Sequence, residues 1–150
     1  MMRVLIFGCG RTGAALARMM ASRGHKVTIL ENDPSSLQRL GENHGCQIFL
    51  GDGLDDDALV EAGIEQADAF LACTRGDNTN LMSAQIAQTR YKVKMVCAKV
   101  NDPSRGAEYN KLGVFCIVPN LLTAGMMRSW LLGEDFAPID TFNKLEELGS

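Results

Sequence analysis

The chain has 150 residues, the usual size of one domain, and its 46% hydrophobic and 22% charged residues are typical of a globular rather than a disordered protein. A net charge of -3 and a pI near 5.3 argue against a chain that binds nucleic acid or an anionic membrane through bulk charge. No apolar run approaches the roughly 20 residues needed to span a bilayer, and five cysteines without a CxxC pair argue against a disulfide scaffold or a zinc ribbon, so we expect a reduced, cytoplasmic protein.

Short apolar runs recur along the chain, and patterns typical of helices separate them. Most of the runs are continuous rather than alternating, which is typical of strands buried on both faces of a parallel sheet. The predicted strands are Arg3–Phe7, Lys26–Leu30, Gln47–Leu50, Ala69–Cys73, Met95–Val100 and Val114–Val118. The predicted helices are Thr12–Arg23, Pro34–Asn43, Asp56–Ala62, Asn78–Tyr91, Pro103–Leu112 and Pro119–Leu132.

Six strands alternating with helices predict an α/β fold: a doubly wound, Rossmann-like parallel sheet of six strands in the order 3-2-1-4-5-6. Glycines that suit C-caps follow four of the helices: Gly24, Gly45, Gly63 and Gly113. We expect residues 1–132 to form this domain. Residues 133–150 show no clear period and are interpreted as a tail or linker, in which only Asn143–Leu148 suits a short helix.

A glycine-rich turn follows the first predicted strand and opens the first helix, and it fits the pattern GxGxxG from Gly8 to Gly13. Gly8 permits the tight turn, Gly10 lets a pyrophosphate approach the backbone, and Gly13 lets the helix and the strand pack closely. The helix N-terminus, with Thr12 in its first turn, offers free N–H groups to an anion. The context favours phosphate binding over a plain strand–helix turn.

An acidic residue ends the second predicted strand. Glu31 lies 18 residues after Gly13, close to the spacing expected for a carboxylate that binds a ribose. A carboxylate there accepts from both ribose hydroxyls and repels a 2′-phosphate, so NADP is disfavoured relative to NAD or an adenine nucleotide. The neighbours Asn32 and Asp33 compete for this role, although Asp33 is better explained as the cap of the next helix.

The loop Gly51-Asp52-Gly53 follows the third predicted strand. In a 3-2-1 arrangement this loop neighbours the adenine side of the site, where Asp52 could accept from the adenine amino group. Helix-cap chemistry explains Asp52 nearly as well, because three further acidic residues follow at 55–57.

Polar residues after the fourth strand face the glycine turn across the crevice where the strand order reverses. Thr74, Asn78 and Asn80 offer neutral hydrogen bonds to a phosphate or a ribose, and Arg75 is either a cationic support or a solvent-facing side chain. Arg11, inside the phosphate turn, can reach a distal phosphate with paired donors. Lys99, near the end of the fifth strand, adds a second positive charge to the same crevice.

Together these pieces resemble the N-lobe of RCK domains, also called TrkA-N or KTN domains. The resemblance rests on GCGRTG, the acid in ILENDP, GDGLDDDALVEAGIEQADAFLACT, DNTNLMSAQIA and AKVNDPSR, which together span roughly residues 3 to 132. It implies a cytosolic regulator of Trk- or Ktr-type potassium transport that binds NAD(H), ATP, ADP or AMP and lies at the inner face of the membrane through its transporter partner.

The resemblance also implies residue roles. By position, Arg11 matches the family arginine that contacts distal phosphates, Glu31 the ribose acid, Asp52 the acid near adenine, and Thr74 and Asn80 the loop that faces the phosphates. Lys99 stands where the family often has arginine. Family members usually continue into a C-terminal lobe. Because this sequence stops at Ser150, we expect either a single-lobe member or a truncated chain.

The last predicted helix, Pro119–Leu132, is apolar nearly all round, so it must be covered on more than one side. We expect it to join a homodimer or a higher ring, with the 133–150 tail folding over it as the alternative.

The alternative function is an NAD-dependent oxidoreductase or redox sensor with a missing substrate domain. Against it, His25 and His44 lie in turns before strands, at the wrong edge of the sheet for catalysis. A stand-alone nucleotide-binding module for an unrelated partner is the third reading. We expect a regulator rather than an enzyme.

Overall fold

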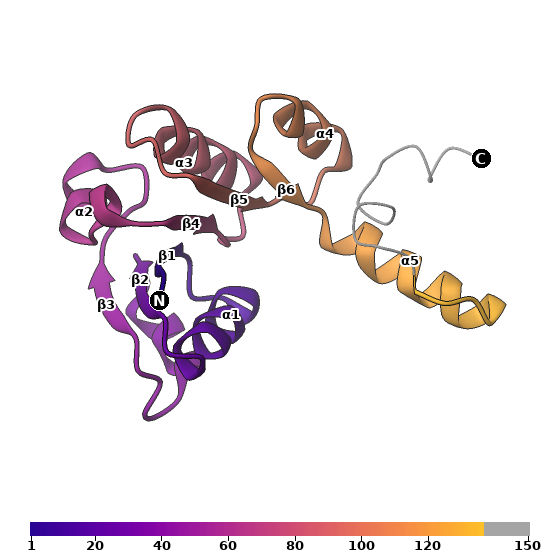
Figure 1. Cartoon of the computed structure of the whole chain (residues 1–150), viewed down its shortest axis with the longest axis horizontal. Helices are drawn as coiled ribbons and strands as arrows, with labels where there is room; N and C mark the ends of the chain where they lie inside the picture. The colour runs from indigo at the N-terminus through magenta and orange to yellow at the C-terminus, as the bar shows by residue number, and fades with distance from the viewer. Residues whose placement is uncertain (137–150) are drawn as a thin grey trace.

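The computed structural model describes residues 1–136 and is built on one parallel sheet (Figure 1). The strands are β1 (Arg3–Phe7), β2 (Lys26–Glu31), β3 (Gln47–Leu50), β4 (Ala69–Ala72), β5 (Met95–Lys99) and β6 (Phe115–Ile117). All neighbouring pairs are parallel, and the order is β3-β2-β1-β4-β5-β6. The predicted fold class and strand order are therefore confirmed.

The connections are mostly α-helices, near the predicted bounds. They are α1 (Arg11–Ser22), α2 (Asp56–Glu61), α3 (Asp77–Thr89), α4 (Pro103–Lys111) and α5 (Pro119–Leu132), with the short 3-10 segments η1 (Pro34–Leu40) and η2 (Ile64–Gln66). The helix expected over 143–148 lies outside the described residues, and η2 was not predicted.

The prediction of a helix over Pro34–Asn43 is wrong in type and in length. The segment is a 3-10 helix that stops at Gly41, whose φ of 72° ends it, so Gly45 is not its cap. Its start is as predicted: Asp33 caps the segment by accepting hydrogen bonds from the backbone N–H and the hydroxyl of Ser35.

Each face of the sheet has its own core. On one face α2, α3 and α4 pack over a cluster that includes Phe7 and Phe70. On the other face α1 and η1 pack over a smaller cluster that includes Ile6 and Ile29. The glycine turn between β1 and α1 therefore lies where the two layers meet at the carboxyl ends of the strands.

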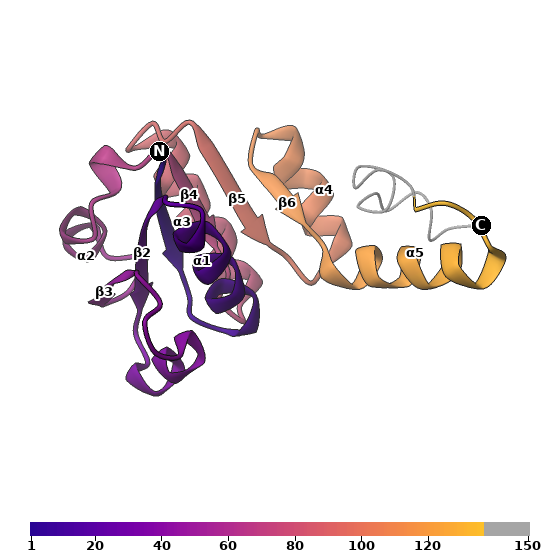
Figure 2. The ribbon, with the colours of Figure 1, turned by 60° about the horizontal axis from the view of Figure 1, so that its bottom comes forward.

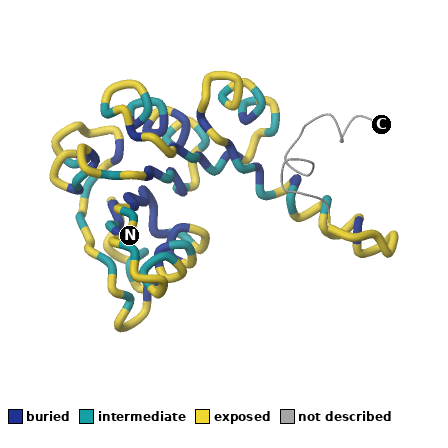
Figure 3. The backbone as a smooth tube through the Cα atoms, viewed as in Figure 1, coloured by how far each residue is buried: buried dark blue, intermediate teal, exposed yellow. Residues whose placement is uncertain are grey.

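The second face is not fully covered. Leu71, Met95 and Phe115 line an apolar groove of about 440 Å³ beside α1, and the latter two side chains are 49% and 43% exposed. No helix of this chain lies over that groove within residues 1–136, because α5 projects away from the sheet (Figures 1 and 2). Most of α5 is exposed along its length (Figure 3), including Trp130 at 75%.

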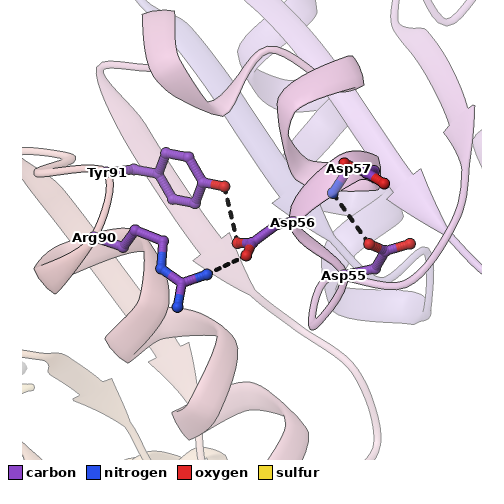
Figure 4. Close-up of polar contacts among 5 residues, drawn as sticks. All are labelled: Asp55, Asp56, Asp57, Arg90 and Tyr91. Carbon is purple, nitrogen blue, oxygen red and sulfur yellow. Dashed lines mark hydrogen bonds and ion pairs between the residues drawn. The ribbon is translucent and has the colours of Figure 1, made fainter.

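Helix α2 is joined to the end of α3 through one carboxylate (Figure 4). Asp56 accepts from the Tyr91 hydroxyl at 2.9 Å and pairs with the Arg90 guanidinium, the one ion pair within residues 1–136. The hydrogen bond from Tyr91 and then the bond from Arg90 hold the pKa of Asp56 below its usual value. Asp55 caps α2 by accepting from the Asp57 N–H at 3.0 Å, so two of the three acids have structural roles.

Within residues 1–136, no helix is long and apolar enough to cross a membrane.

Candidate functional site

The glycine turn has the geometry that an anion needs. Gly8 has φ of 102°, and a Cβ on it would stand 2.9 Å from the backbone of Cys73, so only glycine fits. A Cβ on Gly13 would stand 2.0 Å from the Gly8 oxygen, which explains the close packing of α1 on β1. Gly10 caps α1 without any side-chain hydrogen bond, so the first N–H groups of the helix are not used by a capping side chain.

Glu31 is buried at 8% exposure and connects the glycine turn to the end of β2. One carboxylate oxygen accepts from the Cys9 N–H at 2.5 Å, and the other accepts from the N–H groups of Asn32 and Asp33 at 3.1 and 3.0 Å. Three backbone donors therefore hold the carboxylate at the carboxyl end of β2. A carboxylate has about four acceptor positions, so it retains capacity for a ribose hydroxyl.

A cavity of about 740 Å³, here called the nucleotide cavity, opens between the glycine turn, the end of β2 and the loop after β4. It lies at the carboxyl ends of the strands, where the strand order reverses at β1. Four cationic side chains line it against two carboxylates, although the chain as a whole is acidic. The predicted residues that line it are Gly8, Gly10, Arg11, Thr12, Glu31, Asn32, Thr74, Arg75 and Lys99.

The loop after β4 is organised by a buried amide. Asn80 is fully buried; its oxygen accepts from the N–H and the hydroxyl of Thr74, at 2.9 and 2.6 Å. Its amide nitrogen donates to the carbonyls of Thr74 and Lys99, at 3.0 and 2.8 Å. Asn80, expected to face a phosphate directly, does not line the cavity and instead positions Thr74 and the end of β5.

Asp52 and Gly53 also lie outside the lining of the nucleotide cavity. Asp52 accepts a hydrogen bond from the Leu54 N–H at 2.9 Å, within the loop before α2. The cap of α2 is Asp55, so Asp52 does not cap the helix either. Gly53 is buried against Phe7, whose ring atoms would stand 2.3 to 2.6 Å from any Cβ placed there. Its lack of a side chain serves packing beneath the site.

Sequence reasoning missed two residues that line the cavity on the side of β2. Ser36 and Arg39 come from η1, the segment that was predicted as an α-helix. The signal present in the sequence was the cationic residue Arg39, which lies eight residues after Glu31 on the segment that follows β2. Asp77 lies outside the lining of the cavity, and its structural role was also missed: its two oxygens accept from the N–H groups of Asn101 and Asp102, which connects α3 to the loop after β5.

The cysteines near the cavity are poor nucleophiles. Burial raises the pKa of Cys73 to about 11, against a lowering effect of the Lys99 charge. Burial, followed by the Glu31 charge, raises the pKa of Cys9, which is fully buried beneath the turn. Thiols of this kind remain protonated near neutrality and act as small apolar groups. No group of side chains among residues 1–136 is arranged to hold a metal ion.

The chain matches the model of the TrkA-N domain over residues 4–119. It is 40% identical over 138 residues to the Trk system potassium uptake protein TrkA of Streptomyces coelicolor, covering 92% of this chain and 62% of that relative. The chain thus spans less than two thirds of the length of this curated relative.

Solved structures share the fold at lower identity. The Kef C-terminal domain of Shewanella denitrificans in its AMP-bound form superposes with a TM-score of 0.72 and 23% identity, covering 97% of this chain and 91% of that one. The GsuK channel bound to NAD superposes with a TM-score of 0.65 and 22% identity, covering 82% of this chain and 22% of the channel chain.

Proposed function

The chain belongs to the TrkA-N domain family, and from this membership we propose that it is a nucleotide-binding regulatory subunit, without catalytic activity, of a Trk- or Ktr-type potassium uptake system. The observation that carries the proposal is the nucleotide cavity, where the uncapped start of α1 and four cationic side chains meet at the carboxyl ends of the strands. Residues 1–132 form the nucleotide-binding domain, and the protein acts in the cytoplasm, at the membrane only through its transporter partner.

In this proposal the ligand is NAD(H) or an adenine nucleotide. Its phosphates lie on the start of α1 with Arg11 beside them, and its ribose lies on Glu31. Lys99 and Arg75 support the phosphates from the side of β4 and β5. That AMP and NAD occupy the named relatives supports this ligand class.

Regulation requires two arrangements of an assembly that bind the nucleotide with different affinities. We assign the assembly to a homodimer or a ring in which α5 of one copy covers the apolar groove of β4–β6 in another. Both surfaces are apolar and are left exposed by residues 1–136: Met95 and Phe115 in the groove, and Met127, Trp130 and Leu131 on α5. Burying them together removes apolar surface from water.

Nucleotide binding is tested by calorimetry and thermal shift with NADH, NAD, ATP, ADP and AMP, against the variant Gly10→Ala. A Cβ on Gly10 would stand 3.9 Å from its nearest neighbour, so the variant keeps the fold and the melting temperature of the free protein. The added methyl lies where a phosphate must approach. We expect about 2.7 kcal/mol of stabilisation of the wild type at a ligand concentration a hundredfold above Kd, and none of the variant. Absence of binding by the wild type refutes the proposal.

Assembly is tested by the fluorescence of Trp130, the single tryptophan, together with sizing. We expect the emission to shift to shorter wavelength as the protein concentration rises. Leu131→Glu on α5 and Met95→Glu in the groove prevent the shift. Met82→Glu, at an equally exposed methionine of α3 on the other face, leaves it unchanged. Equal effects of all three variants contradict the proposed interface.

The regulatory role is tested by potassium uptake into vesicles that hold the transporter membrane subunit and the full-length regulator. We expect uptake to change when the nucleotide is added, and Gly10→Ala to abolish that change.

A further inference from the structure

A second cavity lies on the surface of α1. It has a volume of about 570 Å³ and is lined by Arg11, Ala14, Ala15, Arg18, Met19 and Arg39; we call it the arginine groove. Arg11 and Arg39 line both this groove and the nucleotide cavity, so the two cavities are neighbours on either side of these side chains.

The arginine groove leaves the nucleotide cavity on the side of β2. Arg39 lies on η1, which follows β2 directly, and Arg18 lies two turns beyond Arg11 on α1, about 10 Å along the helix. A Cβ on Gly41, at the end of η1, would stand 3.3 Å from Nη1 of Arg18, so this guanidinium reaches across from α1 to η1. Lys99 and the Thr74 loop lie on the opposite side of β1. Through Arg39, the groove therefore neighbours the β2 side of the nucleotide cavity, which Glu31 lines, and not the side of Lys99.

The charge in this groove is unbalanced. No acidic side chain lines it. Within residues 1–136, the guanidinium groups of Arg11, Arg18 and Arg39 form no hydrogen bond or ion pair, although the charge of Arg39 acts to lower the pKa values of Asp33 and Cys9. All three arginines are exposed, so an anion in the groove can reach their guanidinium groups. Guanidinium groups bind phosphate with paired N–H donors.

We propose that the arginine groove is a subsite for a second phosphate group, carried on the 2′ or 3′ oxygen of the ribose of the nucleotide in the main cavity. The inference rests on the proposed function, because the position of Glu31 is what places the ribose beside the groove. It also revises the expectation that Glu31 excludes a 2′-phosphate. Three backbone N–H donors stabilise the negative charge of Glu31, and Arg18 and Arg39 supply two cations besides Arg11, which lies beside the other phosphates.

Isomers of one nucleotide distinguish the effect of where the second phosphate is attached from the effect of its charge. We would titrate the protein calorimetrically with AMP, 5′-ADP, 2′,5′-ADP and 3′,5′-ADP, because the last three carry the same number of phosphates. We expect one or both ribose-phosphorylated isomers to bind about tenfold more tightly than AMP and more tightly than 5′-ADP, which corresponds to one charge-assisted contact. The gain shrinks as salt is raised.

Arg18→Gln removes this gain and leaves the affinity for AMP unchanged, because Arg18 lines the groove but not the nucleotide cavity. The matched control is Arg3→Gln. It removes the same charge at a separate cavity by the amino ends of β1 and β2, and it retains the gain.

Each outcome is decisive. If AMP binds but 5′-ADP binds as tightly as both ribose-phosphorylated isomers, the second phosphate does not enter the arginine groove and the inference alone is overturned. Equal losses in Arg18→Gln and Arg3→Gln also overturn it, since the gain is then bulk electrostatics. If AMP itself does not bind, the proposed function fails first.

Discussion

Replacing Asn80 with alanine tests how the wall of the nucleotide cavity is built. The Asn80 side chain is fully buried at the start of α3 and makes four hydrogen bonds to Thr74 and Lys99. Alanine makes none of them. We expect Asn80→Ala both to destabilise the fold and to weaken nucleotide binding, because the loop after β4 loses its attachment.

The size of the effect follows from the backbone groups that lose a hydrogen-bond partner when Asn80 is replaced. The Thr74 N–H and the carbonyls of Thr74 and Lys99 lose a buried partner, and each such loss costs about 1–3 kcal/mol. Thr74 is half-buried, so water recovers part of this cost at its two groups. We therefore expect a loss of about 2–4 kcal/mol in the free energy of unfolding, or roughly 5–15 °C in melting temperature for a domain of this size.

The assay is urea denaturation followed by circular dichroism, with AMP or NADH titrated into the same preparation. Ser83→Ala is the control, because Ser83 is also fully buried in α3 but donates only to the Asn80 carbonyl at 3.2 Å within the helix. We expect it to cost less than 1.5 kcal/mol and to leave nucleotide affinity unchanged. If Asn80→Ala is no less stable than Ser83→Ala and binds nucleotide equally well, the amide does not organise the site.

Three further predictions concern packing and protonation. Gly53→Ala inserts a methyl within 2.3 Å of the Phe7 ring, and we expect urea denaturation to show a loss of about 1–3 kcal/mol from overpacking. Burial raises the pKa of the Cys97 thiol from 9.0 to about 12, so iodoacetamide should modify it slowly at pH 8 in the fold and rapidly in urea. Because this pKa is raised in the folded state, the stability that it contributes is complete below pH 9 and is lost as pH rises toward 12. Burial and then the bond to Asp56 raise the pKa of Tyr91, so we expect Asp56→Asn to lower that pKa part of the way to its usual value in an ultraviolet titration.

The controls for these three measurements are specific. Gly76→Ala, where a Cβ would meet its nearest atom at 3.4 Å, should cost little, and an equal loss at both glycines contradicts the packing argument. Modification of the thiols at the same rate in folded and unfolded protein contradicts their burial. The titration is done in a Tyr109→Phe background, in which Tyr91 is the single tyrosine. If Asp56→Asn leaves the pKa of Tyr91 unchanged, the hydrogen bond to Asp56 does not contribute to raising it.

The opposite sign applies to Asp56. Its pKa is lowered in the fold, so its contribution to stability is present above the unfolded pKa and is lost as pH falls. Asp56→Asn should therefore flatten the acid side of the stability profile.

The sequence alone determined the parallel sheet, its strand order and the glycine turn between β1 and α1. Continuous apolar runs, the glycine at Gly13 and the acid at Glu31 are local signals, and their meaning depends only on spacing along one strand–turn–helix unit. The apolar character of α5 was also readable, because a helix that is apolar all round cannot be satisfied by one neighbour.

Only the tertiary structure decided which polar residues face the cavity. Asn80 and Thr74 are both polar and close in sequence, yet one lies buried beneath the loop and the other lines the cavity. Asp52 bonds within its own loop. Arg39 lines the cavity from η1, a segment that was predicted to be an α-helix. The direction of a side chain depends on the turn that carries it and on groups distant in sequence that compete for its hydrogen bonds, and neither is written in local spacing.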